Sequence, residues 1–323
     1  MSQELQVVSI VKQAKVNTGE LSTAGARLTH RICLKRIWRH IPFMRTIKSS
    51  KHMSAAARKI IASGETLALV PTMGFLHEGH LALVDRAHKA ADKVVVSIFV
   101  NPAQFGPKED LRSYPRNMGR DLKLLRERGV NLVFAPDVKE MYPAGYATCV
   151  EVEKLSRTLE GKFRPGHFRG VTTVVAKLFN ICLPDMAVFG QKDYQQAVVL
   201  KKLALDLGYP IKIIIGPTLR EPNGLALSSR NKYFTRAQRE EAACLYRGLS
   251  AARRAFRQGE RRAANLKNII RREAKRTCKT VRFDYVALTD YDSLKPLTRA
   301  TKGAVISLAA KIHGVRLIDN IRL

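Results

Sequence analysis

Short apolar runs alternate along the chain with segments in which apolar residues recur every three or four positions. From residue 54 onward the runs are strand-sized and continuously apolar, without the polar alternation of a half-exposed strand. They predict strands at residues 67–70, 94–100, 131–135, 186–189 and 211–215. The periodic segments predict helices at residues 54–62, 81–91, 120–128, 171–181 and 194–207.

This regular alternation predicts a doubly wound, parallel α/β sheet of the Rossmann-like type. Continuously apolar strands are buried on both faces, and the helices between them fit right-handed crossovers. We therefore expect a Rossmann-like domain at residues 44–216. Helices rich in Arg and Ala at 236–276 and short strands at 282–288 and 304–309 predict a smaller C-terminal α+β lid domain at 217–323.

Residues 1–43 form an N-terminal extension of uncertain status, with no clear periodicity before a basic, partly apolar stretch at 27–40. The extension carries Glu4 and Glu20 and has no continuous apolar segment followed by a small-residue cleavage site. It therefore makes a poor signal peptide. No apolar run reaches the ~18 residues of a membrane-spanning helix, so we expect a cytoplasmic protein with no membrane contact.

Polar clusters follow three of the predicted strands, at residues 71–80, 101–104 and 190–196. Ligands in doubly wound sheets bind beyond the carboxyl ends of the strands. Because parallel strands end at the same edge of the sheet, the three clusters should converge on one crevice.

The first cluster, Pro71-Thr-Met-Gly-Phe-Leu-His-Glu-Gly-His80, lies between a buried strand and a helix start. His77 and His80 are three residues apart, so they share one face of the first helical turn. A helix N-terminus attracts phosphate, and Gly74 and Gly79 would let the backbone approach a nucleotide closely. Two surface histidines in a turn are the alternative, but the strand, loop and helix context favours a phosphate site. No third His or Cys ligand is evident, so we do not expect zinc here.

The charge balance is unusual for a chain of this composition. Lys and Arg total 57 against 27 Asp and Glu, a net charge of +30, which makes anionic substrates or nucleic acid natural partners. The excess is dense in Arg253-Arg254, Arg261-Arg262, Arg271-Arg272 and Lys275-Arg276. No aromatic residues interleave with these pairs, so we expect a solvated helix face and no nucleic-acid partner. The five cysteines include no C-x-x-C pair, and neither a disulfide framework nor a zinc site is indicated.

The first cluster resembles the H-x-G-H signature of the nucleotidylyltransferase superfamily. Six further segments resemble, in order, the pantothenate synthetase (pantoate beta-alanine ligase) family, over about residues 44 to 323. They are Ser97-Ile-Phe-Val-Asn-Pro-Ala-Gln-Phe105, Tyr114-Pro-Arg116, Arg164-Pro-Gly-His-Phe-Arg-Gly-Val171, Phe189-Gly-Gln-Lys-Asp-Tyr-Gln-Gln196, Gly224-Leu-Ala-Leu-Ser-Ser-Arg-Asn231 and Arg316-Leu-Ile-Asp-Asn320.

The resemblance implies a two-step ligase. The pantoate carboxylate attacks the α-phosphate of ATP to give pantoyl adenylate and pyrophosphate, and the beta-alanine amine then displaces AMP to give pantothenate. The resemblance further implies ATP with Mg2+ and a homodimer. We assign no protein ligand to the metal, because magnesium often takes most of its ligands from phosphate and water.

The resemblance also implies the site residues. His80 is the expected proton donor, with His77 and Lys192 as the other catalytic residues, and Gln104 and Gln196 bind pantoate. The ATP-binding residues are then Met73, Gly74, Phe75, Leu76, His77, Glu78, Gly79, His80, Gly190, Gln191, Lys192, Asp193, Leu219, Leu227, Ser228, Ser229 and Arg230.

Several of these residues have a simpler interpretation without the resemblance. Lys192 would be a solvated surface lysine, Asp193 either caps its helix or holds the nucleotide, and Ser228-Ser229-Arg230 would be an ordinary turn. The loop with Arg164, His167 and Arg169 either gates the site or is structural. Asp121 is a candidate carboxylate near the site, although we expect it on a helix surface.

Three departures and two rival functions stay open. Residues 1–43 exceed the family pattern, the charge excess is unusual, and Gln191 stands where many relatives carry Glu. One rival is an H-x-G-H nucleotidylyltransferase with another acceptor, for which no carboxylic acid would trigger pyrophosphate release. The other is a basic binding protein on the same scaffold, with salt-sensitive nucleic-acid affinity and no turnover.

Overall fold

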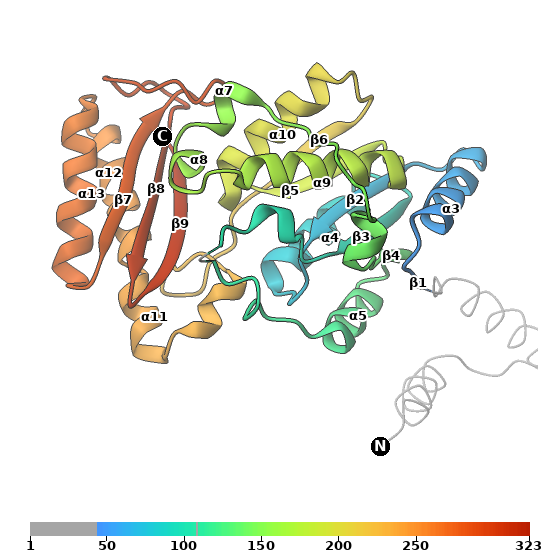
Figure 1. Cartoon of the computed structure of the whole chain (residues 1–323). Coiled ribbons are helices and arrows are strands. Elements are labelled where there is room, and N and C mark those ends of the chain that lie inside the picture. Colours follow the sequence, from blue (N-terminus) through green and yellow to red (C-terminus); the bar gives the residue numbers. More distant parts are fainter. Residues whose placement is uncertain (1–43, 108) are drawn as a thin grey trace, which may run out of the picture. The chain divides into compact units, whose positions relative to one another are not determined.

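The computed structural model describes residues 44–107 and 109–323 (Figure 1). Residues 44–323 belong to one compact unit. The predicted extension at residues 1–43 lies outside the described residues. The proposed division of the remainder at residue 217 stays a prediction.

Six parallel strands form the larger sheet, in the order β1-β4-β3-β2-β5-β6. The strands are β1 (Arg45–Ile47), β2 (Leu67–Thr72), β3 (Lys93–Ile98), β4 (Leu132–Phe134), β5 (Met186–Gly190) and β6 (Lys212–Gly216). Successive residues of β2 face opposite sides of the sheet, and both sides are buried: Leu67 and Leu69 join one apolar cluster, Ala68 and Val70 the other. This burial explains the continuously apolar strands and confirms the predicted fold class.

Helices connect these strands and cover both faces of the sheet (Figure 1). The long ones are α3 (Ser50–Ala62), α4 (Glu78–His88), α5 (Met118–Glu127), α9 (His167–Cys182) and α10 (Tyr194–Asp206). Shorter turns are η1 (Pro102–Gln104), α6 (Val138–Met141), α7 (Glu153–Ser156), α8 (Glu160–Phe163), η2 (Gln191–Asp193) and η3 (Ser229–Tyr233). No helix among the described residues combines the length and apolar character needed to cross a bilayer.

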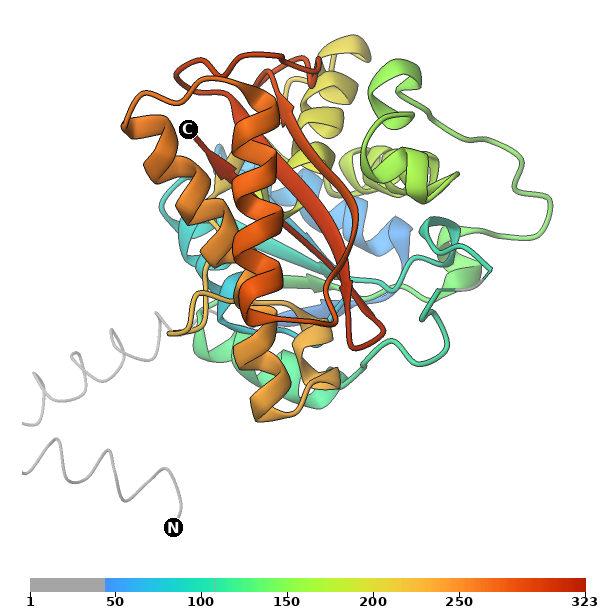
Figure 2. The ribbon, with the colours of Figure 1, turned by 90° about the vertical axis from the view of Figure 1, so that its left-hand side faces the viewer.

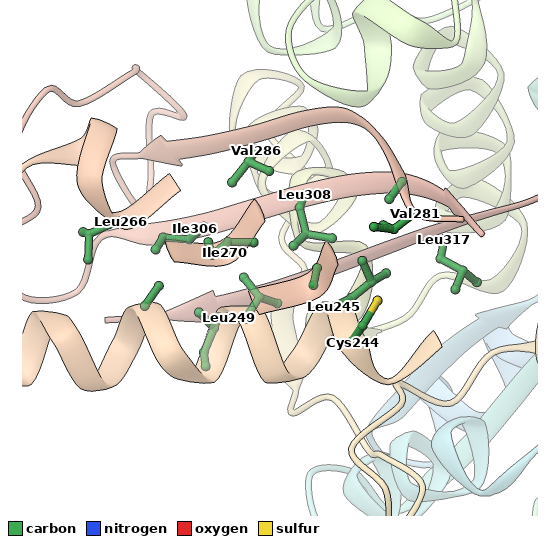
Figure 3. Close-up of a cluster of buried hydrophobic side chains, with 14 of the residues drawn as sticks. Cys244, Leu245, Leu249, Leu266, Ile270, Val281, Val286, Ile306, Leu308 and Leu317 are labelled. Atoms are coloured by element: carbon green, nitrogen blue, oxygen red, sulfur yellow. The ribbon is translucent and has the colours of Figure 1, made fainter. Parts of the chain in front are cut away.

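The C-terminal part contains a three-stranded antiparallel sheet with helices on one face (Figure 2). Its elements are α11 (Arg236–Ala242), α12 (Cys244–Arg257), α13 (Ala263–Thr277), β7 (Arg282–Thr289), β8 (Val305–Ile312) and β9 (Val315–Arg322). Leu245 and Leu249 of α12 meet Ile270 of α13 and Ile306 and Leu308 of β8 in one core (Figure 3).

The basic residues of α12 and α13 lie largely opposite this core. Those that are exposed include Arg254, Arg257, Arg272, Lys275 and Arg276, and Arg262 at the N-cap of α13 is exposed as well. Apolar residues recur at helical spacing on the inner face, so the charges lie on the outer one. The exposed charges therefore lie on the outer face of the two helices, and the absence of a nucleic-acid partner for this face stays a prediction.

Two strands of the structure, β1 and β9, were not predicted from the sequence. β1 has three residues, too few for a period to emerge. In β9, Arg316, Asp319 and Asn320 interrupt the apolar positions, which hides the apolar run that marks the other strands.

Candidate active site

The three polar clusters predicted to converge do so at the carboxyl edge of the larger sheet. A cavity of about 180 Å3 is lined by Met73 and His80 after β2, Gln104 after β3, and Asp193 and Gln196 after β5. A second cavity of about 600 Å3 is lined by residues of the C-terminal part and by four of the predicted ATP-binding residues, namely Lys192, Asp193, Ser228 and Arg230. Since Asp193 and Arg230 line both, the two cavities adjoin.

Asp121 of α5 holds the loop after β2 in place. Its carboxylate accepts hydrogen bonds from the backbone N–H groups of Phe75 at 2.7 Å and Leu76 at 2.8 Å. Gly74 has a φ of +81°, and a Cβ there would lie 3.1 Å from the Asp121 carboxylate and 3.0 Å from the Ile98 side chain. This position therefore requires glycine.

The expectation that Asp121 lies on a helix surface is wrong, because the residue is only 1% exposed. Burial raises the pKa of its carboxyl group, while the two backbone donors act in the opposite direction. The helical period of 118–127 could not reveal this role, since α5 carries only one other buried residue, Leu125.

His77 and His80 cap the N-terminus of α4 reciprocally. His77 Nδ1 accepts from the backbone N–H of Gly79 at 3.2 Å, and His80 Nδ1 accepts from the backbone N–H of His77 at 3.3 Å. A ring nitrogen that accepts from a backbone N–H carries no hydrogen, so in each neutral ring the hydrogen is assigned to Nε2. Among the described residues no protein acceptor pairs with either Nε2–H, so both N–H groups could donate to a ligand.

Both histidines are held neutral. Burial lowers the pKa of His77 to about 4, and the nearby Lys192 acts in the same direction. Burial, His77 and Lys192 lower the pKa of His80 well below its usual range. At the α4 N-terminus, where anions are favoured, the pair therefore supplies hydrogen-bond donors without carrying charge of its own.

Lys192 brings a positive charge to the same edge and is not the solvated lysine of the simpler interpretation. Its side chain is 21% exposed, and Nζ lies 3.6 Å from the Asp193 carboxylate. Asp193 occupies the N-cap position of α10 but makes no side-chain capping hydrogen bond. The Asn320 amide donates to the carbonyls of Gln191 at 2.8 Å and Lys192 at 3.0 Å, which fixes this loop.

Gln104 is positioned from two sides. Its Oε1 accepts from Asn101 at 3.1 Å, and its Nε2 lies 3.1 Å from Met73 Sδ. The Gln104 carbonyl accepts from His167 Nδ1 at 2.9 Å, while Arg164 lies 3.0 Å from His167 Nε2. Burial, with Arg164 acting in the same direction, lowers the pKa of His167 to about 4.

Sequence reasoning missed Asn101 as a site residue. Its side chain is 1% exposed, lines the smaller cavity, and also accepts from Tyr142 at 2.8 Å. The available signal was its position directly after a predicted strand, among the residues at 101–104.

The loop entering the C-terminal part places Arg230 at both cavities. Arg230 forms a two-bond ion pair with Asp110, at 2.8 and 3.1 Å. Ser228 caps η3 by accepting from the Arg230 N–H, and Ser229 Oγ donates to the Phe75 carbonyl at 3.4 Å. The segment is thus both a turn and a link to the loop after β2.

The remaining predicted residues, His77 among them, line neither of the two cavities. The Leu227 N–H donates to the Leu219 carbonyl at 3.0 Å, and Glu78 pairs with Arg128 at 3.1 Å on the surface. A Cβ on Gly79 would lie 2.9 Å from the His77 ring, so the two residues pack closely. Gly190 is the last residue of β5. No group of three His, Cys, Asp or Glu side chains suited to a metal occurs among residues 44–107 and 109–323.

Comparison with known proteins gives one consistent result. The family model described as pantoate-beta-alanine ligase matches residues 44–322. The chain is 52% identical to the pantothenate synthetase of Moorella thermoacetica over 280 residues, which cover 87% of this chain and 98% of that protein.

Two solved structures are similar over most of their length. The crystal structure of pantothenate synthetase from Thermus thermophilus has 47% identity and a TM-score of 0.82, covering 86% of this chain and 99% of that one. The pantoate-beta-alanine ligase of Francisella tularensis, in complex with beta-gamma ATP and beta-alanine, has 35% identity and a TM-score of 0.71. That match covers 86% of this chain and 97% of the other.

Proposed function

Because the chain belongs to the pantoate-beta-alanine ligase family, it condenses pantoate with beta-alanine at the expense of ATP, and we propose that the two adjoining cavities are where it does so. The observation that carries the proposal is the pair of neutral histidines at the N-terminus of α4, with two Nε2–H donors free for a ligand beside Lys192.

The first step joins pantoate to AMP. A pantoate carboxylate oxygen bonds to the α-phosphorus of ATP, the bond from that phosphorus to its bridging oxygen breaks, and pyrophosphate leaves. Charge grows on the phosphate oxygens, so fixed donors and cations lower the barrier. His77 and His80 donate to these oxygens, Lys192 and Arg230 balance the charge, and Gln104 and Gln196 hold the pantoate hydroxyls and carboxylate.

In the second step the beta-alanine nitrogen attacks the acyl carbon of pantoyl adenylate. The carbon–oxygen bond to AMP breaks and the amine loses a proton. Because the adenylate also reacts with water, a site that stays closed between the steps protects it.

Magnesium fits this site as the companion of ATP. Magnesium is commonly bound through one or two carboxylates together with substrate phosphates and water. Asp193 would serve as such a carboxylate because it lines both cavities. Asp121 is unsuited, since both of its oxygens already accept backbone N–H groups. The ion would neutralise phosphate charge.

We further propose that the protein is a cytoplasmic homodimer, as the resemblance implies. Light scattering coupled to gel filtration tests the dimer. A mass of one chain, 36.2 kDa, at micromolar concentration would contradict it.

The deciding experiment measures pyrophosphate release by the purified chain with ATP, magnesium and pantoate, with and without beta-alanine. We expect release that requires pantoate, and sustained turnover to AMP and pantothenate that requires both acids. ATP binding without pantoate-dependent release would contradict the proposal and favour a nucleotidylyltransferase with another acceptor.

A further inference from the structure

One face of β9 contacts the larger sheet's ligand-binding edge at two points. Side chains alternate along a strand, so Arg316, Ile318 and Asn320 share a face, while Leu317 and Ile321 belong to the core under α12 and α13. Arg316 reaches α8, and Asn320 holds the carbonyls of Gln191 and Lys192. β9 thus connects α8 with the loop that carries Lys192.

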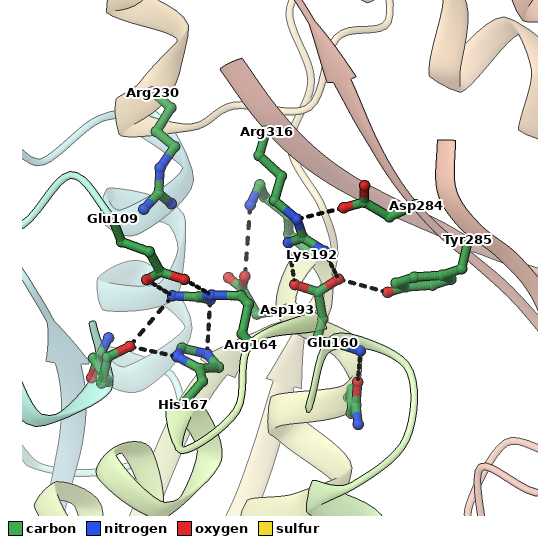
Figure 4. Close-up of polar contacts among 12 residues, drawn as sticks. Glu109, Glu160, Arg164, His167, Lys192, Asp193, Arg230, Asp284, Tyr285 and Arg316 are labelled. Atoms are coloured by element: carbon green, nitrogen blue, oxygen red, sulfur yellow. Dashed lines mark hydrogen bonds and ion pairs between the residues drawn. The ribbon is translucent and has the colours of Figure 1, made fainter. Parts of the chain in front are cut away.

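The contact with α8 is an ion pair on the wall of the larger cavity, in which Glu160 is buried and the Arg316 side chain is 23% exposed. Arg316 donates two hydrogen bonds to the Glu160 carboxylate, at 2.6 and 2.9 Å, and a third to Asp284 at 2.8 Å (Figure 4). Tyr285 donates to Glu160 at 2.9 Å, and its ring stacks on Phe163 with centroids 5.7 Å apart. Glu160 is 6% exposed, so three donors from the C-terminal sheet meet a carboxylate removed from water.

Glu160 stands at one end of a short, closely packed segment. Its backbone N–H donates to Gln195 of α10 at 2.9 Å. A Cβ on Gly161 would lie 1.7 Å from the Ser156 carbonyl oxygen, so the backbone of this turn packs too closely for any residue but glycine. At the other end, Arg164 and His167 contact each other, and His167 holds the Gln104 carbonyl.

The ion pair therefore connects both walls of the cavities. Through residues 160–167 it reaches Gln104, and through β9 and Asn320 it reaches Lys192. A shift of β9 against α8 would move Lys192 relative to Gln104, and misplacement of reacting groups by about 1 Å costs on the order of a hundredfold in rate.

We propose that Glu160 and Arg316 are positioning residues of the ligation reaction. Their ion pair holds β9 against the 160–167 segment, and so sets the distance between the Lys192 and Gln104 walls. The inference rests on the proposed function of this site. It predicts that loosening the pair slows adenylate formation and lets water reach the adenylate before beta-alanine does.

The main variants are Arg316→Lys, which keeps the charge but loses the two-bond geometry, and Glu160→Gln, which is isosteric. We expect kcat to fall about tenfold in each, with the dissociation constant for ATP, measured by calorimetry, changed less than threefold. The double variant should be no worse than the poorer single one, because the residues act through each other.

The distinguishing readout is the amount of AMP formed per pantothenate in the complete mixture. Water that attacks the acyl carbon of the adenylate returns pantoate and releases AMP. The ratio should therefore rise from one in the unaltered chain to about two or more in the variants. A purely structural role would lower the amount of folded protein and leave this ratio at one.

Lys201→Met is the matched control. It breaks an exposed ion pair, Lys201 to Asp292 at 3.1 Å, that also joins α10 to the C-terminal part. We expect an unchanged kcat and a ratio of one. Tyr285→Phe tests the pair more gently if the main variants fail to fold. It should give the same rise in ratio with a loss in kcat of about threefold.

Folded variants with unchanged kcat and a ratio of one would overturn the positioning role. An unaltered chain without pantoate-dependent pyrophosphate release would instead overturn the proposed function. The two failures are therefore distinguishable in a single series of measurements.

Discussion

The loop after β2 and the strand β9 serve the same cavities in different ways. The loop, residues 73–80, carries the two histidines that we propose as donors to the ligand, and its own backbone sets their tautomers. β9 chiefly holds other segments in place. Arg316 donates hydrogen bonds to Glu160, and Asn320 donates one to the Lys192 carbonyl. The loop thus carries the candidate reactive groups and receives part of its support from Asp121 of α5, whereas β9 provides mainly support.

This difference predicts two kinds of variant. Changes in the loop remove both a donor and a cap, so they should affect the chemical step most. Changes in β9 leave the donors of the loop in place and alter chiefly distances, so they should show partial losses and leakage of the intermediate.

The largest effect should come from His80→Ala. The change removes one Nε2–H donor and the acceptor for the His77 N–H, so one of the two reciprocal capping bonds is lost while the bond from the Gly79 N–H to His77 remains. Loss of one well-placed donor costs about 3 kcal/mol, or roughly a hundredfold in kcat. Pyrophosphate release with pantoate and ATP measures it. His88→Ala, at the other end of α4, is the control, and equal losses in both variants would remove the special role of the loop.

The next effect should come from Asp121→Asn, which tests the support under the loop. The amide has one acceptor oxygen, so one of the two backbone N–H groups, Phe75 or Leu76, loses its partner. An unsatisfied buried donor costs about 1 to 3 kcal/mol, and we expect a loss of that size in the free energy of unfolding together with a roughly tenfold loss in kcat.

Urea unfolding and kinetics on the same preparation check this prediction. Asp92→Asn, on the surface beside Thr66, is the control for removal of a hydrogen-bonded carboxylate far from the loop. A stable Asp121→Asn protein with full activity would show that the loop holds its shape without α5.

The contrast between the two regions also explains what the sequence could predict. The loop lies between a continuously apolar strand and a periodic helix, so both its position and its chemistry are local features of residues 67–91. The larger sheet was predictable for the same reason. The predicted roles of His77, His80 and Lys192 rest on the resemblance and await the experiments.

The support of the site was not predictable, because it depends on contacts between residues distant in sequence. Asp121 is 45 positions from Leu76, and Glu160 is 156 from Arg316. Neither residue differs locally from a solvated charge on a helix or strand. These pairs meet only in the folded chain, through the strand order of the larger sheet and the contact of β9 with α8.

Acid should weaken the cavity region before it weakens the ion pairs of β9. His77 and His167, each with a pKa of about 4, and His80, with a pKa also well below 6.5, are neutral when folded. The unfolded chain takes up protons from about pH 6.5 downward, so the free energy of unfolding falls as the pH drops below 6.5.

At pH 5 the loss should reach at most about 2 kcal/mol per histidine relative to pH 7.5. Urea unfolding at the two pH values measures it, above the range in which most carboxylates titrate. His167→Gln should remove about a third of the difference. A pH-independent free energy over this interval would contradict the buried neutral state.

The smallest effect should come from the basic outer face of α12 and α13, behind the sheet that contains β9. Arg254 and Arg272 are exposed, and the apolar residues of both helices already face the core. Exposed substitutions of this kind change stability by within about 0.5 kcal/mol, so Arg254→Gln with Arg272→Gln should leave unfolding and kcat unchanged. Salt titration of binding to a poly(U) oligonucleotide completes the test. A tight complex with a log–log slope of several units, reduced in the double variant, would give this face a nucleic-acid partner and make it a functional surface.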